Sequence, residues 1–167
     1  MKVKGLIACI GVFLLIISAT AIAADYKNWI PLLPETVGGM PQSGKPDGMN
    51  MESGDVKWSS VHQRYEGDDP ERYADLTLLG GNAPQMAGFQ MMSNMKMETD
   101  EQIVKTVQVK GYKALLNLEK NEKRGTLMIS LGEEMLAVIE VSPITKEAEM
   151  ITLGEKLPLA DFAAQAE

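Results

Sequence analysis

The chain has 167 residues, of which 45% are hydrophobic, 23% charged and 5% aromatic. This balance is typical of a globular protein and excludes a collagen-like, wholly disordered or disulfide-stapled chain. With 16 Lys and Arg against 23 Asp and Glu, the formal net charge is -7 at pH 7. An acidic chain is repelled by the phosphates of DNA and RNA, so we expect no nucleic-acid partner.

The first 24 residues have the pattern of a secretory signal peptide. Lys2 and Lys4 precede an uncharged apolar stretch over residues 6–17, and small residues follow up to Ala24. A basic start, an apolar middle and an A-x-A end predict cleavage after Ala23 or Ala24. An uncleaved anchor is the alternative, because the apolar stretch approaches the roughly 20 residues that span a bilayer. We expect cleavage, a periplasmic or secreted location and no stable membrane insertion afterwards, since an anchor needs no small-residue exit site.

Cys9 is the one cysteine of the chain and lies inside the predicted signal peptide, ahead of most of the apolar stretch. It is therefore badly placed for a lipoprotein cleavage site, and we interpret it as part of the signal. The mature chain then has no disulfide, and its core must stabilise it alone. A chain of this length buries enough surface to do so.

The composition of the mature chain changes once. Residues 31–54 are rich in Pro and Gly, which predicts an irregular arm over residues 25–55 in front of a single domain over residues 56–167. Trp29-Ile30 and Leu32-Leu33 are apolar enough to dock this arm onto the domain.

A hairpin and a helix are predicted next. Residues 56–66 and 72–79 alternate between apolar and polar side chains on either side of an acidic turn, as the two strands of a hairpin do. Pro84 is suited to the first turn of a helix that extends to about Met97. One stripe of that helix should face the sheet, and Met86 and Met97 lie outside it. The stripe consists of Gly88, Phe89, Met91, Met92 and Met95.

The second half has the clearest pattern. Four strand-like runs cover residues 102–109, 112–119, 126–131 and 135–141, and the loops between them are too short for crossover connections. They therefore form an antiparallel meander.

Two helical segments are predicted after the meander. Thr145 can cap a helix over residues 146–154, and a short helical piece follows over residues 157–166. The inward residues of the helix over residues 146–154 should be Ala148, Ile151 and Leu153. The whole order predicts the α+β class, with a mostly antiparallel sheet of about six strands and helices packed on one face.

The second half also carries a resemblance. Residues 107–114 (VQVKGYKA), 125–129 (GTLMI) and 136–139 (LAVI), with an acidic helix after Ser142-Pro143, resemble the C-terminal sheet of small secreted bacterial proteins of unknown function. The layout over residues 72–155 is similar to the PsbP/Mog1-like sheet domains and to the DUF4367 family. This resemblance implies a binding or regulatory module with no catalytic residue to carry over.

The residues themselves offer little enzyme chemistry. The mature chain has no Cys, one His at position 62 and neither a G-x-S-x-G motif nor a Gly-rich phosphate loop. Nucleophilic catalysis needs a nucleophile beside a base, and zinc needs His or thiolate donors. We therefore predict no enzyme, no catalytic residue and no bound cofactor. His62, alternating with Val61 on a strand, is interpreted as a half-exposed polar residue.

Acidic residues crowd the predicted hairpin turn. Glu66, Asp68, Asp69 and Glu71 offer oxygens of the kind that Ca²⁺ prefers, but their spacing is not that of an EF-hand loop. A turn is also where acids normally face water, so we favour a solvated turn.

Methionine is the compositional oddity, with 12 residues in the chain. Thioethers suit Cu(I), and two Met at positions i and i+4 of a helix can share one ion. Packing against the sheet explains the same residues as adaptable hydrophobes, and an exposed peptide-binding groove is a third interpretation. No metal site is favoured; the copper alternative names Met91, Met95, Met92, His62, Met49 and Met51.

These observations predict a non-enzymatic periplasmic or secreted binding module. Its partner would be a protein or a small molecule of the cell envelope. The alternative is a Met-rich periplasmic Cu(I)-binding protein.

Overall fold

The computed structural model describes residues 25–92 and 94–166, and the predicted signal peptide over residues 1–24 lies outside them. The strands are β1 (Thr36–Val37), β2 (Met40–Ser53), β3 (Val56–Glu66), β4 (Tyr73–Gly81), β5 (Lys96–Glu98), β6 (Gln102–Val109), β7 (Tyr112–Glu119), β8 (Arg124–Ser130) and β9 (Met135–Ser142). The helical elements are the 3-10 turns η1 (Tyr26–Asn28) and η2 (Ile30–Leu32) and the helices α1 (Pro84–Met92), α2 (Glu147–Lys156) and α3 (Leu159–Ala163).

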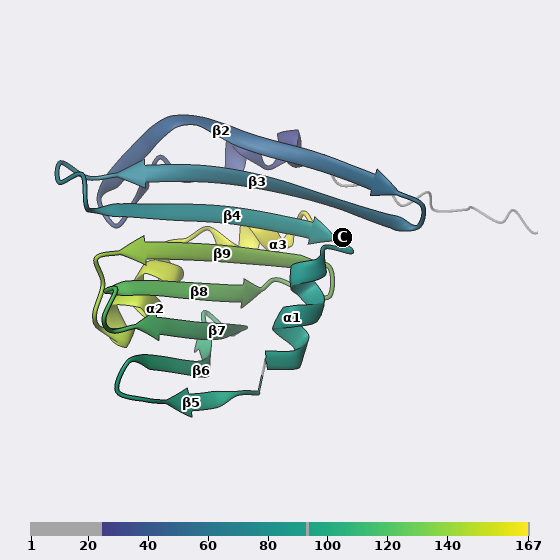
Figure 1. The fold of residues 1–167 in the computed structure, drawn as a ribbon. Coiled ribbons are helices and arrows are strands. Elements are labelled where there is room, and N and C mark those ends of the chain that lie inside the picture. Colours follow the sequence, from purple (N-terminus) through teal and green to yellow (C-terminus); the bar gives the residue numbers. More distant parts are fainter. Residues whose placement is uncertain (1–24, 93, 167) are drawn as a thin grey trace, which may run out of the picture.

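All nine strands belong to one antiparallel sheet in the order β1-β2-β3-β4-β9-β8-β7-β6-β5 (Figure 1). The first four strands and the last five are two meanders, joined where β4 pairs with β9. The predicted α+β class is therefore confirmed, and so is the antiparallel meander of β6 to β9. The expected number of about six strands is too low, because β1, β2 and β5 were not anticipated.

The predicted hairpin is confirmed as β3 and β4, which pair Val61 with Leu78 and Tyr65 with Ala74. In the meander, β7 pairs with β8 and β8 with β9 through directly opposite apolar residues, such as Leu116 with Leu127. Short loops fix these registers, as the sequence indicates.

The expectation of an irregular arm is wrong for residues 40–53, which form the long strand β2. Its Pro and Gly residues are tolerated because β2 is near the edge of the sheet, where a missing N–H costs no ladder bond. A bulge between Ser43 and Asp47 accommodates Gly44 and Pro46. The predicted docking of Trp29 and Leu33 is confirmed, since both are buried in the main core.

Helices lie on both faces of the sheet, which corrects the expectation of one covered face (Figure 1). On one face, α2, α3, η1 and η2 cover the main core, which we call the closed face. On the other face, α1 crosses one end of the strands and packs on a second apolar cluster. Strand residues alternate in direction, so consecutive apolar residues such as Leu115 and Leu116 supply both clusters.

The helix after β4 is shorter than predicted and is turned differently. It ends at Met92, and Met97 belongs to β5. Phe89 is buried as expected, but Met86 is buried instead of Met91, which is 86% exposed. Met86 and Phe89 follow the buried Ala83 at intervals of three residues, and this spacing sets the face that contacts the sheet.

The helix after β9 also differs in detail. Lys146, not Thr145, is the N-cap residue, and α2 buries Met150 and Gly154, whereas Ala148 is exposed. The final helical piece is limited to Leu159–Ala163. No helix within the described ranges is long and apolar enough to cross a membrane.

Candidate binding surface

The face that carries α1 is only partly covered, and its uncovered part is a band of polar side chains, which we call the open band. Polar residues continue the alternation of the apolar residues beneath α1: Asp75 and Thr77 precede Leu79 on β4, and Glu140 follows Leu136 and Val138 on β9. All members are partly exposed. They are His62, Arg64, Tyr73, Asp75, Thr77, Gln102, Asn117, Glu119, Arg124, Thr126 and Glu140.

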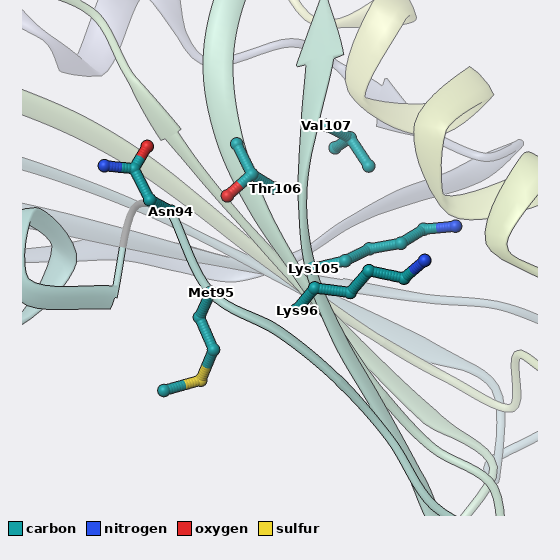
Figure 2. Close-up of a pocket in the computed structure, with 6 residues that line it drawn as sticks. All are labelled: Asn94, Met95, Lys96, Lys105, Thr106 and Val107. Atoms are coloured by element: carbon teal, nitrogen blue, oxygen red, sulfur yellow. The ribbon is translucent and has the colours of Figure 1, made fainter.

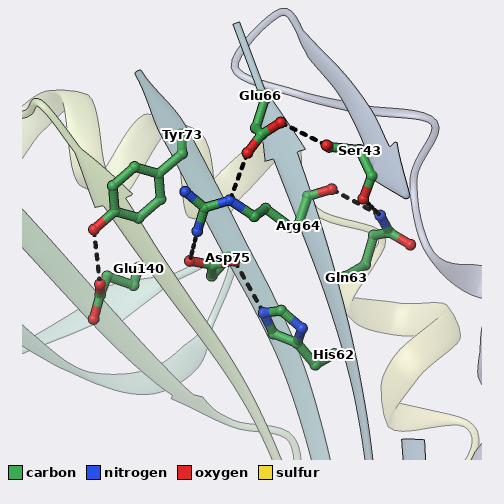
Figure 3. A network of polar contacts seen from close by, with 8 residues as sticks. All are labelled: Ser43, His62, Gln63, Arg64, Glu66, Tyr73, Asp75 and Glu140. Atoms are coloured by element: carbon green, nitrogen blue, oxygen red, sulfur yellow. Dashed lines mark hydrogen bonds and ion pairs between the residues drawn. The ribbon is translucent and has the colours of Figure 1, made fainter. Parts of the chain in front are cut away.

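One half of the open band is a continuous network centred on Arg64 (Figure 3). Its Nη1 donates to Asp75 Oδ2 at 2.9 Å and its Nε donates to Glu66 Oε1 at 2.8 Å. The guanidinium carbon also lies 4.2 Å from the centre of the Tyr73 ring. A cation stacked on an aromatic ring and bonded to two carboxylates is held in one orientation.

The network reaches two more strands, β2 and β9, at its ends. His62 Nε2 lies 2.9 Å from Asp75 Oδ1, and the Tyr73 hydroxyl donates to Glu140 Oε1 at 3.3 Å. At the other end the Ser43 hydroxyl donates to Glu66 Oε2 at 2.6 Å. Contacts therefore run from β2 through β3 and β4 to β9.

The other half of the band is centred on Arg124. This guanidinium is paired with Glu119 and lies 2.7 Å from Glu122 Oε2. Gln102 Nε2 donates to Asn117 Oδ1 at 2.8 Å, which extends the contacts to β6.

Contacts in and beside the band shift the pKa values of three side chains. The Ser43 hydroxyl and the Arg64 guanidinium lower the pKa of Glu66. Burial raises the pKa of Glu119, but its pairing with Arg124 outweighs this and leaves the pKa below its usual value. Burial, together with Glu140, raises the pKa of Tyr73.

The surface is acidic and offers no reacting pair. Its two guanidinium groups face an excess of carboxylates, namely Glu66, Asp75, Glu119, Glu122 and Glu140. Asp75 orients His62, but the described residues place no hydroxyl in hydrogen-bonding contact with that imidazole. Within residues 25–92 and 94–166, no three His, Cys, Asp or Glu side chains gather as a metal site would require. A charged, hydrogen-bonded surface of this kind can recognise another macromolecule.

The structure divides the residues of the copper alternative into two groups on different parts of the sheet. Because α1 ends at Met92, Met91 and Met95 are not one turn apart on a helix. Met49 and Met51 lie on β2, near the opposite edge of the sheet from β5, and His62 lies beside them on β3 but is bonded to Asp75. The helical spacing that suggested a shared ion is therefore absent.

The acidic turn between β3 and β4 uses one of its carboxylates locally. Asp69 Oδ1 accepts a hydrogen bond from the Glu71 N–H at 2.9 Å, and the Asp69 carbonyl accepts one from the Arg72 N–H. Asp68 and Glu71 are exposed. This turn has the local hydrogen bonding typical of Asp in turns.

An open hollow of about 510 Å³ lies beside the start of β5 (Figure 2). Its lining residues are all at least partly exposed, so it does not enclose a small molecule. Lys105 is paired with Glu147 of α2, and Lys113 Nζ donates to Asn94 Oδ1 at 2.9 Å. The lining residues are Asn94, Met95, Lys96, Lys105, Thr106 and Val107.

Apart from His62, sequence reasoning named none of the open band as site residues. A signal was present, because polar residues such as Thr77, Asn117 and Thr126 occupy every second position of strands whose other positions are apolar. The sequence does not show which strands are neighbours in the sheet. It therefore could not show that these residues form one surface.

No protein-family model, curated protein sequence or solved structure matches this chain. The resemblance to PsbP/Mog1-like and DUF4367 domains therefore stays a sequence-based expectation.

Proposed function

We propose that the protein is an exported, non-enzymatic module that binds a basic protein partner of the cell envelope through the open band. The observation that carries this proposal is the unequal covering of the two sheet faces. Four helical elements cover one face, whereas α1 covers one end of the other and leaves a hydrogen-bonded acidic surface that spans six strands.

The chemistry of the band supports a protein partner. Its side chains are fixed by mutual hydrogen bonds, so binding costs little additional ordering. Its excess of carboxylates attracts positive charge and speeds the encounter with a basic surface. The hollow beside β5 is too open to bury a small ligand, which disfavours a small-molecule carrier.

The test is site-specific photo-crosslinking in the native cell. A photo-reactive side chain at Thr126, on the open band, should give a discrete adduct with another protein. The same group at Thr152, which is exposed on α2, serves as the matched control and should give none. Amino-terminal sequencing of the adduct's module should begin at Ala24 or Asp25 if the signal is removed.

Two results would contradict the proposal. Adducts of equal yield from Thr126 and Thr152 would show that the partner does not bind preferentially at the open band. Tight Cu(I) binding in competition with a chelator, without any adduct, would favour the copper alternative instead.

A further inference from the structure

The outer edge of β2 is free over most of its length. β1 pairs only Thr36 and Val37 with Pro41 and Met40, and the Gln42 N–H donates to the Glu35 carbonyl at 3.2 Å. Beyond this point, the described residues place no strand on the outer side of β2 (Figure 1).

The two halves of this edge are different. The first half is protected, because the bulge after Ser43 contains Lys45 and Pro46, and bulges, Lys and Pro all discourage strand addition. The second half, residues 47–53, pairs with β3 in unbroken register and contains neither Lys nor Pro. We call it the open edge, since alternate N–H and C=O groups of such a strand point outward.

Contacts behind the strand hold the open edge in place. The Asn50 side chain accepts hydrogen bonds from the Tyr26 N–H at 3.2 Å and from the Ser59 hydroxyl at 2.8 Å, and its Nδ2 donates to Asp25 Oδ1 at 3.0 Å. The Tyr26 ring lies against Gly48, where a Cβ atom would come within 2.1 Å of the ring. The strand is thus ordered before any partner arrives, which lowers the entropic cost of binding.

The side chains of the open edge differ between its two faces. Met49 and Met51 lie on the α1 side, opposite Ser60 and Trp58, and are 46% and 43% exposed. Glu52 lies on the other side with Asn50 and its partner Asp25. A partner strand therefore meets two methionines, with Asp47 beside them, on one face and polar and acidic groups on the other.

Charge distinguishes the partner from a second copy of this chain. Asp25, Asp47 and Glu52 surround the open edge, and Lys57 is paired with Glu52 at 2.7 Å. Pairing two such edges would bring these carboxylates together, and like charges across strands are destabilising. A strand with basic side chains meets no such repulsion.

We propose that residues 47–53 accept an extended segment of a partner protein as an additional strand, and that this segment alternates apolar with basic residues. Its apolar side chains contact Met49 and Met51, and its basic side chains contact Asp25 and Glu52, while main-chain hydrogen bonds supply register. This inference rests on the proposed function, because it names the chemistry of one segment of the partner.

The test uses a short synthetic peptide of alternating lysine and valine as the probe, with a peptide of alternating glutamate and valine as its match. Backbone amide exchange in residues 47–53 should slow about tenfold with the lysine peptide and stay unchanged with the glutamate peptide. Replacing both Met49 and Met51 by Lys should weaken binding of the lysine peptide about tenfold. The matched control replaces Met91 and Met95, which are also exposed, by Lys and should change the affinity for the lysine peptide by less than about twofold.

Three results would overturn this inference. The open edge is not the site if the lysine peptide leaves amide exchange in residues 47–53 unchanged. The same conclusion follows if the two double variants weaken peptide binding equally. Slowing with protein concentration alone, together with a doubled mass in solution, would identify the occupant as a second copy. Each outcome leaves the crosslinking from Thr126 unaffected, so this inference can fail while the proposed function stands.

Discussion

The two faces of the sheet stabilise the molecule in different ways. The closed face is a continuous apolar core in which the side chains of Trp29, Tyr65, Met150 and Phe162 are at most 1% exposed. The other face combines a small apolar cluster under α1 with a polar network whose members remain partly exposed. The comparison teaches that apolar burial is concentrated on one face, which leaves polar side chains accessible on the other.

The largest expected effect tests this division within one strand. Ile129 and Thr126 both lie on β8, but Ile129 is completely buried on the closed face and Thr126 belongs to the open band. Ile129→Lys should lower the free energy of unfolding by on the order of 4 kcal/mol, because it buries a charge without a partner. Thr126→Lys should change it by less than about 0.5 kcal/mol. Chemical denaturation measures both, and similar midpoints for the two variants would refute the division.

A smaller effect distinguishes two tyrosines, one on each face. Burial raises the pKa of Tyr65 to about 12, and its hydroxyl donates to the Pro34 carbonyl at 2.9 Å. The pKa of Tyr65 in the folded state exceeds the unfolded value of about 10. The contribution of its neutral phenol to the free energy of unfolding is therefore complete below pH 10 and is lost as the pH rises towards 12. We expect a loss of about 2 kcal/mol over this range.

Two variants isolate this contribution. Tyr65→Phe should flatten the alkaline loss of stability, whereas Tyr73→Phe, on the open band, should change it less. Stability measured by denaturant titration at each pH gives the comparison, and identical alkaline profiles for the parent and Tyr65→Phe would contradict the expected role of burial.

The smallest effect compares how tightly the helices pack on each face. An added Cβ at Gly154 of α2 would lie 2.6 Å from Leu127 Cδ2, whereas at Gly88 of α1 it would meet nothing within 4 Å. Gly154→Ala should therefore destabilise by about 1 to 2 kcal/mol through overpacking, which exceeds the gain in helix propensity. Gly88→Ala should stabilise by about 0.5 to 1 kcal/mol. Shifts of the same sign in thermal unfolding would show that the two helices pack alike.

The sequence predicted best where local rules fix the structure. The meander from β6 to β9 follows from alternation and from loops too short for crossovers, and the β3–β4 hairpin follows from its turn. β2 was missed because Pro46 and Gly44 indicate irregular structure unless the strand is known to lie near an edge.

The candidate surface was beyond reach of the sequence for a related reason. Consecutive apolar residues such as Leu78 and Leu79 show that both faces are covered, but not where the covering ends. The open band depends on the pairing of β4 with β9, a long-range contact that no periodicity reveals. Its polar members could be found one by one, but not as a group.

The same pairing has a consequence for the time at which the sheet can form. Tyr73 and Glu140, bonded across β4 and β9, are 67 positions apart in the chain. During synthesis the first meander emerges with its inner strand unpaired and its apolar residues Leu76 and Leu78 uncovered, because β9, α2 and α3 come later. Closing so long a loop costs chain entropy, and contacts with β9, α2 and α3 are needed to offset that cost. We therefore expect the first meander to become stable only after β9, α2 and α3 have been synthesised.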